Sequence, residues 1–318
     1  YIYDLLVDLE PRDVTKSSGK YQTFIAVNLP LSIAVEGGYS SERHEKVMEY
    51  AKADISAAYY ALTIEQPMAI CTWGNSYIGY SIDTYIRDDL IPNGSMLRMF
   101  YLRVTYDDYY AADIATKYAD LRAAVNNFRL PNESDPVSII QGINDYLKGR
   151  ITYDNSKSCH DAYGALVSSD RKAVCEGFSK GFQLLCQKFG IECYTIYGYS
   201  IPEYSRTSDF DRSAHAWNMV HINGNYYGVD VTWNQTTDDN YLMTGSQYFN
   251  STHNAGYNAS NGGVLFENKS VEVNGLFLYK EDGGSSMDID PLKIGLICVI
   301  VILRAALVLK GRGSKNGD

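Results

Sequence analysis

The dipeptide Asn223-Gly224 constrains the local fold of this chain more tightly than any other feature. It separates two alternating runs of residues, SAHAWNMVHI and NYYGVDVTW. An Asn-Gly pair in this setting predicts a two-residue hairpin loop with positive φ at both positions. The second strand is expected to continue to Trp233. Counting outward from the loop then places His215 and Asp230 on one face as diagonal neighbours, roughly 7–8 Å apart between backbone positions, within reach of an imidazole meeting a carboxylate.

This histidine and aspartate have two interpretations on the hairpin alone. A carboxylate can fix the tautomer and the orientation of a catalytic imidazole, as the third member of a catalytic triad does. A structural hydrogen bond between the same residue types on a half-buried sheet fits the pattern equally well. The catalytic interpretation needs a nucleophile elsewhere in the chain.

A cysteine that precedes a helical pattern is the candidate nucleophile. The segment RKAVCEGFSKGFQLLCQKFG contains Cys175 near its start and ends at Gly190, a residue type that terminates helices. The apolar side of this predicted helix comprises Phe178, Phe182, Leu185 and Phe189. Cys175 is therefore expected in the first turn, where the helix dipole and free backbone N–H groups favour a thiolate and can bind an oxyanion. Cys186 and Cys193 are expected to be inert thiols in or near the core.

The rest of the chain alternates between helical and strand patterns. The expected elements are helices over 41–63 and 111–128 and from Ser134 onward, strands over 71–86 and 96–106, strands and turns over 1–36, and a loop over 152–173. The apolar stripe of the helix that begins at Ser134 comprises Val137, Ile140, Ile143 and Leu147. No linker rich in Pro, Gly or Ser interrupts residues 1–279, which indicates one domain, or an N-terminal subdomain packed on a catalytic half.

Charge and cysteine content argue against several classes of protein. The 318 residues carry a net charge of −10 and no basic patch interleaved with aromatic residues, so nucleic acid is a poor candidate partner. The six cysteines include no Cys-x-x-Cys pair, and Cys159-His160 lacks a second ligand pair at zinc spacing. The sequence therefore predicts neither a metal site nor a cofactor.

The C-terminal residues suggest a membrane anchor. Sixteen residues, IGLICVIVILRAALVL, are apolar except for Arg304. As a helix they would extend about 24 Å, short of the hydrocarbon core of roughly 30 Å. Acidic residues precede this run and basic residues follow it, an asymmetry that places the tail in the cytoplasm and the preceding domain outside. A buried or interfacial helix is the alternative. Since the chain starts at Tyr1, we interpret it as a processed product or a fragment.

Three blocks of residues resemble the transglutaminase-like superfamily. They are AYGALV (162–167), AVCEGFSKGFQLLCQKFGIEC (173–193) and HAWNMVHINGNYYGVDVTW (215–233), which follow one another in the family's order within residues 134–235. They look like the bacterial branch that carries VCxGY, HAWN and DVTW motifs. The chain departs from this pattern at Phe178, where many members have Tyr.

The resemblance implies an α+β fold similar to that of papain-like cysteine proteinases, with the cysteine helix packed on an antiparallel sheet. It also implies a catalytic triad of Cys175, His215 and Asp230. We therefore predict cysteine-dependent acyl transfer on peptide or carboxamide bonds of a protein or peptide substrate, by a protease, an amidase or a transglutaminase. The alternative is a non-catalytic peptide- or envelope-binding module on the same fold.

The predicted organisation has five parts. They are an N-terminal helix and strand region (1–130), a transglutaminase-like catalytic domain (131–280), a spacer (281–292), a transmembrane helix (293–310) and a basic tail (311–318). The expected location is the cell surface, with a single C-terminal span in the membrane and the catalytic domain outside the cytoplasm.

Overall fold

The computed structural model describes residues 2–28, 55–74, 76–85, 97–154, 160–200, 213–236, 242–244, 252–254, 272–273 and 276–277. The chain divides into two units, Tyr1–Lys280 and Glu281–Asp318, and all described residues lie in the first. The predicted spacer, C-terminal apolar helix and basic tail therefore lie outside the described residues. Within the part of the chain that is described, no helix has both the length and the apolar character needed to cross a bilayer.

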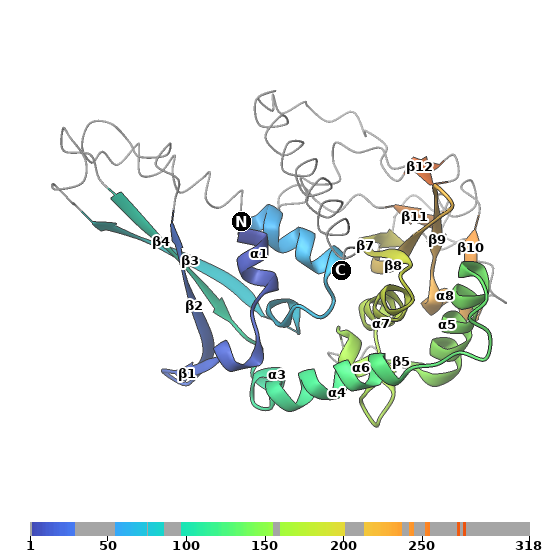
Figure 1. Ribbon diagram of the computed structural model, residues 1–318, viewed down its shortest axis with the longest axis horizontal. Helices are drawn as coiled ribbons and strands as arrows, with labels where there is room; N and C mark the ends of the chain where they lie inside the picture. Colours follow the sequence, from blue (N-terminus) through green and yellow to red (C-terminus); the bar gives the residue numbers. More distant parts are fainter. Residues whose placement is uncertain are drawn as a thin grey trace, which may run out of the picture. The chain divides into compact units, whose positions relative to one another are not determined.

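A four-stranded antiparallel sheet is the main feature of the N-terminal part of the described chain (Figure 1). In spatial order its strands are β1 (Thr15–Ser17), β2 (Lys20–Asn28), β4 (Leu97–Thr105) and β3 (Tyr77–Tyr85). Short helical elements accompany it, namely α1 (Ile2–Val7), η1 (Pro11–Asp13), η3 (Ile70–Thr72) and a helical segment at 55–65. Strand β4 confirms the strand that was predicted over 96–106.

Two N-terminal predictions were wrong in part. Residues 2–7 form a helix because the fully buried Leu6 packs into the core, and this packing outweighs a weak local pattern. The strand predicted over 71–86 begins only after a turn at Gly74, whose φ of 56° redirects the chain. Part of the helix predicted over 41–63 lies outside the described residues.

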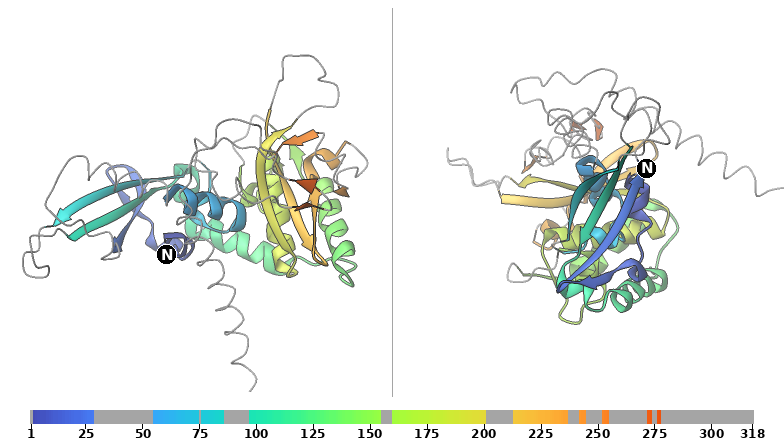
Figure 2. Two further views of the ribbon diagram at one scale, coloured as in Figure 1. Left: turned by 90° about the horizontal axis from the view of Figure 1, so that it is seen from above. Right: turned by 90° about the vertical axis from the view of Figure 1, so that its left-hand side faces the viewer.

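A five-stranded antiparallel sheet belongs to the later part of the chain (Figure 2). In spatial order its strands are β10 (Leu242–Thr244), β9 (Asn225–Val229), β8 (Ser213–Ile222), β7 (Glu192–Ser200) and β11 (His253–Asn254). Two strand pairs are not hydrogen-bonded into this sheet, namely antiparallel β12 (Glu272–Val273) with β13 (Leu276–Phe277) and parallel β5 (Thr152–Tyr153) with β6 (Lys172–Ala173).

Helix α7 (Cys175–Lys188) packs on strands β7 and β8 of this sheet and also contacts four other helices (Figure 1). The remaining helices are α3 (Asp108–Ala111), α4 (Ile114–Asn127), α5 (Pro136–Arg150), α6 (Ala162–Leu166) and α8 (Val231–Asn234). Helices α4, α5 and α7 confirm three predicted helices. The α+β arrangement, with the cysteine helix on an antiparallel sheet, is confirmed as well.

One detail of a predicted helix was wrong, and so was one predicted loop. Val137 is 50% exposed and does not belong to the apolar stripe of α5, because the helix turns Ile139 toward the core in its place. The segment predicted as a loop over 152–173 contains α6, β5 and β6. These elements are too short to produce a periodic pattern in the sequence.

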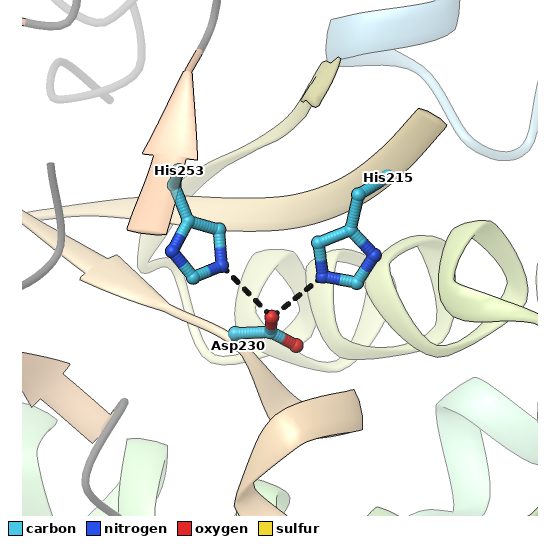
Figure 3. A group of neighbouring side chains, drawn as sticks. All are labelled: His215, Asp230 and His253. Carbon is cyan, nitrogen blue, oxygen red and sulfur yellow. Dashed lines mark hydrogen bonds and ion pairs between the residues drawn. The ribbon is translucent and has the colours of Figure 1, made fainter. Parts of the chain in front are cut away.

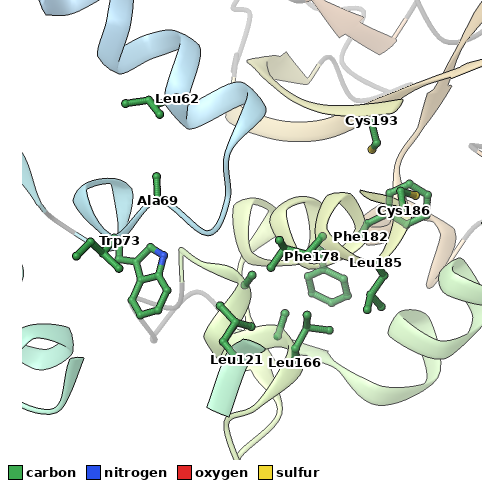
Figure 4. Packing of buried hydrophobic residues seen from close by; sticks show 14 of the residues in the cluster. Leu62, Ala69, Trp73, Leu121, Leu166, Phe178, Phe182, Leu185, Cys186 and Cys193 are labelled. Atoms are coloured by element: carbon green, nitrogen blue, oxygen red, sulfur yellow. The ribbon is translucent and has the colours of Figure 1, made fainter. Parts of the chain in front are cut away.

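The middle turns of helix α7 are buried on both the apolar and the polar side. Phe178, Phe182 and Leu185 are at most 1% exposed and pack among the side chains that Figure 4 shows. Lys180 and Gln183, on the other side, are equally buried. A helix enclosed in this way is a rigid support for a side chain at its first position.

The hairpin predicted from Asn223-Gly224 is confirmed. Both loop residues have positive φ, 52° and 80°, and the strands pair in the expected register near the loop. The predicted continuation of the second strand to Trp233 is wrong, since β9 ends at Val229. Asp230 caps helix α8 instead, and its Oδ1 atom accepts a hydrogen bond from Trp233 N at 3.1 Å. An aspartate at an N-cap satisfies a backbone donor that has no partner within the helix.

Candidate active site

Cys175 occupies the first position of helix α7. Its predecessor Val174 has extended backbone angles, φ −91° and ψ 175°, and is the N-cap residue. The Cys175 side chain is half-buried, whereas the other described cysteines, Cys71, Cys186 and Cys193, are buried. The N–H groups in the first turn of a helix have no partners within it and carry the positive end of its dipole. Among the described cysteines, Cys175 is thus the one that combines a helix start with access from solvent.

The next residue, Glu176, anchors the first turn of α7. Its carboxylate accepts hydrogen bonds from Lys180 Nζ at 2.8 Å and Tyr197 OH at 2.9 Å, and pairs with His160 Nδ1 at 3.0 Å. Burial alone would raise the pKa of Glu176, but the charge of Lys180 and the hydrogen bonds from His160 and Lys180 lower this pKa to about 2. Glu176 therefore stays negatively charged near neutral pH, beside the positive end of the helix dipole.

His215 on strand β8 and Asp230 at the start of α8 form a buried pair (Figure 3). His215 Nε2 lies 2.7 Å from Asp230 Oδ2, and the side chains are 6% and 1% exposed. Burial lowers the pKa of His215, but the charge of Asp230, its hydrogen bond and the neighbouring Cys175 raise this pKa to about 10. Burial raises the pKa of Asp230, but His215 and a second histidine outweigh it and lower this pKa. These shifts favour an imidazolium paired with a carboxylate near neutral pH.

Cys175 neighbours His215, and its influence is among the causes that raise the pKa of His215. Because Nε2 is bound to Asp230, Nδ1 is the ring nitrogen that a proton exchange with Cys175 would use. The structure thus brings together Cys175, His215 and Asp230, the three residues singled out from the sequence. Their catalytic role stays a prediction.

Tyr153 of strand β5 lies at the same cysteine, although the sequence placed it in a loop. Burial, followed by the charge of the neighbouring Cys175, raises the pKa of Tyr153. In the parallel pair of β5 and β6, Tyr153 lies opposite Ala173, two residues before the cysteine. The Tyr153 ring stacks on Phe178 with 6.4 Å between ring centroids. A two-residue strand gives no periodic signal from which this position could be predicted.

A second imidazole, that of His253, binds Asp230, and the sequence did not predict it. His253 Nε2 lies 3.0 Å from Asp230 Oδ2, the oxygen that also binds His215, and its Nδ1 lies 3.0 Å from Thr252 Oγ1. Strand β11, which carries His253, pairs with β7 at Ser200 and not with a strand that is close in sequence. No spacing rule links a residue on such a strand to the hairpin.

Within the described residues, His215, Asp230 and His253 also form a group with the donor types that transition metals prefer. Their ligand atoms lie within 4.8 Å of one another. Both nitrogen-to-oxygen distances, 2.7 and 3.0 Å, are hydrogen-bond lengths, and both nitrogens approach the same carboxylate oxygen. A metal ion would instead need the three atoms at about 2.0–2.1 Å from a shared centre. These distances fit a hydrogen-bonded group of three side chains.

Part of this chain is similar in sequence to known proteins. A family model described as the transglutaminase-like superfamily matches residues 125–231, a range that includes Cys175, His215 and Asp230. Kyphoscoliosis peptidase from Mus musculus is 31% identical over 94 residues, which cover 27% of this chain and 14% of that protein. Kyphoscoliosis peptidase from Homo sapiens is 26% identical over 161 residues, which cover 46% of this chain and 24% of that protein. The matches thus span at most about a quarter of these curated relatives.

A solved structure shows a weaker likeness. The periplasmic domain of TgpA from Pseudomonas aeruginosa has 15% sequence identity and a TM-score of 0.29, and the match covers 54% of this chain and 67% of that one. A score of this size supports no conclusion about the site.

Proposed function

Because residues 125–231 belong to the transglutaminase-like superfamily, we propose that this protein is a cysteine-dependent acyl-transfer enzyme acting on peptide or carboxamide bonds. The observation that carries the proposal is the buried pair of His215 and Asp230, 2.7 Å apart, beside a cysteine at the first position of a helix. A protein or peptide is the proposed substrate, and the two curated relatives bear the name peptidase.

The proposed first step forms a thioester. The proposed reacting form is an ion pair in which His215 already holds, at Nδ1, the proton of the Cys175 thiol, and the sulfur attacks the substrate carbonyl carbon. The N–H groups at the start of α7 are the expected donors to the oxyanion of the tetrahedral intermediate. His215 then gives its proton to the leaving amine as the C–N bond breaks, while Asp230 keeps the ring in place.

The proposed second step releases the acyl group. Water attacks the thioester in a protease or amidase, and the products are a carboxylic acid and the free thiol. An amine attacks it in a transglutaminase, and the product is a new amide. In both cases His215 accepts the proton of the incoming nucleophile. The residues of the candidate site are compatible with either acceptor.

The test of this proposal is chemical trapping of the thioester. The full chain is incubated with a library of peptides that carry glutamine amides or peptide bonds, with and without a fluorescent primary amine, and adducts are located by mass spectrometry. We expect an acyl adduct on Cys175 that is absent from Cys175→Ala and reduced at least about 10-fold in His215→Ala. Incorporation of the amine would identify transamidation, and release of free acid would identify hydrolysis.

His221 provides a matched control on the same strand. Its Nδ1 atom pairs with Glu192 at 2.9 Å, so His221→Ala removes an imidazole from β8 without touching the candidate site. This variant is expected to form the adduct at the wild-type rate. The enzyme proposal fails if Cys175 reacts with iodoacetamide no faster than a free cysteine peptide and Cys175→Ala retains all turnover, and a binding module would then explain the fold better.

The location of the protein is a separate proposal. We place the catalytic domain outside the cytoplasm, with residues 293–310 as a single membrane span, on the basis of their apolar composition and the charges on either side. The full chain is then expected in the membrane fraction and extractable only with detergent. Recovery of the full chain in the soluble fraction would contradict the anchor without affecting the proposed chemistry.

A further inference from the structure

We propose that His253 is a positioning residue that extends the site to a relay of four residues, Cys175, His215, Asp230 and His253. This inference rests on the proposed function and deepens it. His253 acts through Asp230, whose carboxylate it holds in the orientation that receives His215.

Strand pairing brings the two histidines to the same face of the sheet. His215 pairs with Gly198 of β7, and His253 pairs with Ser200 of the same strand. Because these two β7 positions are two residues apart, their partners project from one face. Glycine at position 198 adds no side chain between the two strands that carry the histidines. Both rings point toward Asp230, one from β8 and one from β11 (Figure 3).

The ring of His253 is held from several sides. Its Nδ1 and Nε2 atoms lie 3.0 Å from Thr252 Oγ1 and 3.0 Å from Asp230 Oδ2. Its centroid lies 4.6 Å from that of Trp233 and 4.9 Å from that of Trp217. A carboxylate oxygen offers only lone pairs, so Nε2 carries the hydrogen and donates it. The side chain is 1% exposed, and a hydrogen bond shielded from water in this way is strengthened.

Asp230 is thereby bound at both carboxylate oxygens. Oδ2 accepts from His215 and His253, and Oδ1 accepts from Trp233 N. Without His253, Oδ2 would lose one of its two donors, so the carboxylate would be held less firmly and less of its charge would be neutralised. That charge would then act more strongly on His215, which would keep its proton to higher pH and give it up less readily to a leaving amine.

The titratable groups around His215 come from several elements of the described chain. Cys175 lies on α7 and Asp230 precedes α8, while Tyr153 of β5 neighbours Cys175. His253 of β11 contacts the same carboxylate oxygen as His215. A substitution of His253 is therefore expected to affect the Cys175 thiol indirectly, through Asp230 and His215.

The test compares His253→Leu, which has no donor, with His253→Gln, whose amide can still donate to Asp230. The rate of Cys175 alkylation by iodoacetate is measured from pH 5 to 11 in the full chain, together with turnover of the peptide found by thioester trapping. We expect the alkaline inflection of alkylation to move upward by about 0.5 pH unit or more in His253→Leu. We also expect kcat to fall about 10-fold to 100-fold with little change in KM. His253→Gln should restore most of both.

The behaviour of His253→Leu decides the matter. If His253→Leu folds and keeps the wild-type pH profile and kcat, the inference is wrong. If His253→Leu does not fold, the wild-type protein decides: ¹⁵N NMR must show His253 protonated at Nε2, and a ring without hydrogen at Nε2 overturns the proposal. His221→Leu, made on β8, should leave the profile unchanged. Wild-type turnover in Cys175→Ala would refute the proposed function itself. If Cys175 is alkylated normally and the His253 variants change neither the pH profile of alkylation nor kcat, the positioning role alone is refuted.

Discussion

Tyr153 is the residue that most directly modifies the surroundings of the candidate nucleophile. The thiol and the backbone N–H of Cys175 are among the groups that influence the pKa of its hydroxyl group, and its ring stacks on Phe178. A carbonyl oxygen under attack by this sulfur would develop its charge close to the same N–H group. A phenolic O–H at this position can therefore be a second donor to the oxyanion.

We expect Tyr153→Phe to lower kcat about 10-fold to 100-fold, because it removes the proposed donor and keeps the stacked ring. Alkylation of Cys175 by iodoacetamide has no comparable oxyanion, so its rate should change much less. Steady-state kinetics on the trapped peptide, beside alkylation rates, measure both effects. Tyr194→Phe is the matched control, since Tyr194 OH binds Glu192 at 2.6 Å on the outer part of the sheet. A wild-type kcat in Tyr153→Phe would remove the hydroxyl from the mechanism.

At the scale of elements, helix α7 supports the site through a buried polar side. Gln183 donates to Ile64 O at 2.6 Å and to Cys193 O at 3.0 Å, and its side-chain oxygen accepts from Thr195 at 2.8 Å. One glutamine therefore joins α7 to strand β7 and to the helical segment at 55–65. Lys180, one turn earlier, reaches Thr72 O at 3.4 Å. These bonds fix the helix that presents Cys175.

Replacing Gln183 should destabilise the fold, since Gln183→Ala leaves two buried carbonyl groups and a buried hydroxyl without this partner. The expected loss in free energy of unfolding is about 2 kcal/mol or more, because each unsatisfied buried polar group costs roughly 1–3 kcal/mol. Gln187→Ala is the control, since the exposed Gln187 makes a comparable bond to Glu65 O at 2.8 Å. Its expected loss is below about 1 kcal/mol. Urea unfolding of the full chain measures the free energy of unfolding of both variants. Equal losses in Gln183→Ala and Gln187→Ala would show that burial does not make the Gln183 bonds more important for stability.

At the scale of the whole molecule, the buried pair of His215 and Asp230 links stability to pH. The pKa of His215 rises to about 10 on folding, so its contribution is complete below the unfolded value of about 6.5 and is lost as the pH rises through about 10. The pKa of Asp230 falls on folding, so its contribution is complete above the unfolded value of about 3.9 and is lost as the pH falls below it. The pair therefore stabilises the fold most between about pH 4 and 6.5.

This linkage predicts that the free energy of unfolding depends on pH differently in the wild-type chain and in Asp230→Asn. From about pH 7 to 10 the folded wild-type chain holds one proton more than the unfolded chain at His215, so its free energy of unfolding should fall by up to about 1.4 kcal/mol per pH unit from this group. In Asp230→Asn the carboxylate that raises the pKa of His215 is missing, and this part of the slope should disappear. Urea unfolding at several pH values gives both curves, and parallel curves would show that the pair does not titrate as assigned.

Several features were determined by the sequence itself because each depends on residues close together in the chain. The Asn223-Gly224 loop follows from the backbone preferences of two residues, and helix α7 follows from apolar spacing and a terminal glycine. The candidate roles of Cys175, His215 and Asp230 were likewise reached from a helix start, one hairpin and three motif blocks.

Tertiary structure alone decided where β9 ends and which further residues reach the site. Asp230 meets His215 as the N-cap of α8 and not as part of a strand, because the cap satisfies a backbone donor of that helix. Tyr153 and His253 arrive on two-residue strands that pair with β6 and β7. Their partners are remote in sequence, and such pairings leave no local period. The burial of the polar side of α7 also depends on tertiary structure, since Gln183 and Lys180 contact Ile64 and Thr72, which are 119 and 108 residues away from them in the sequence.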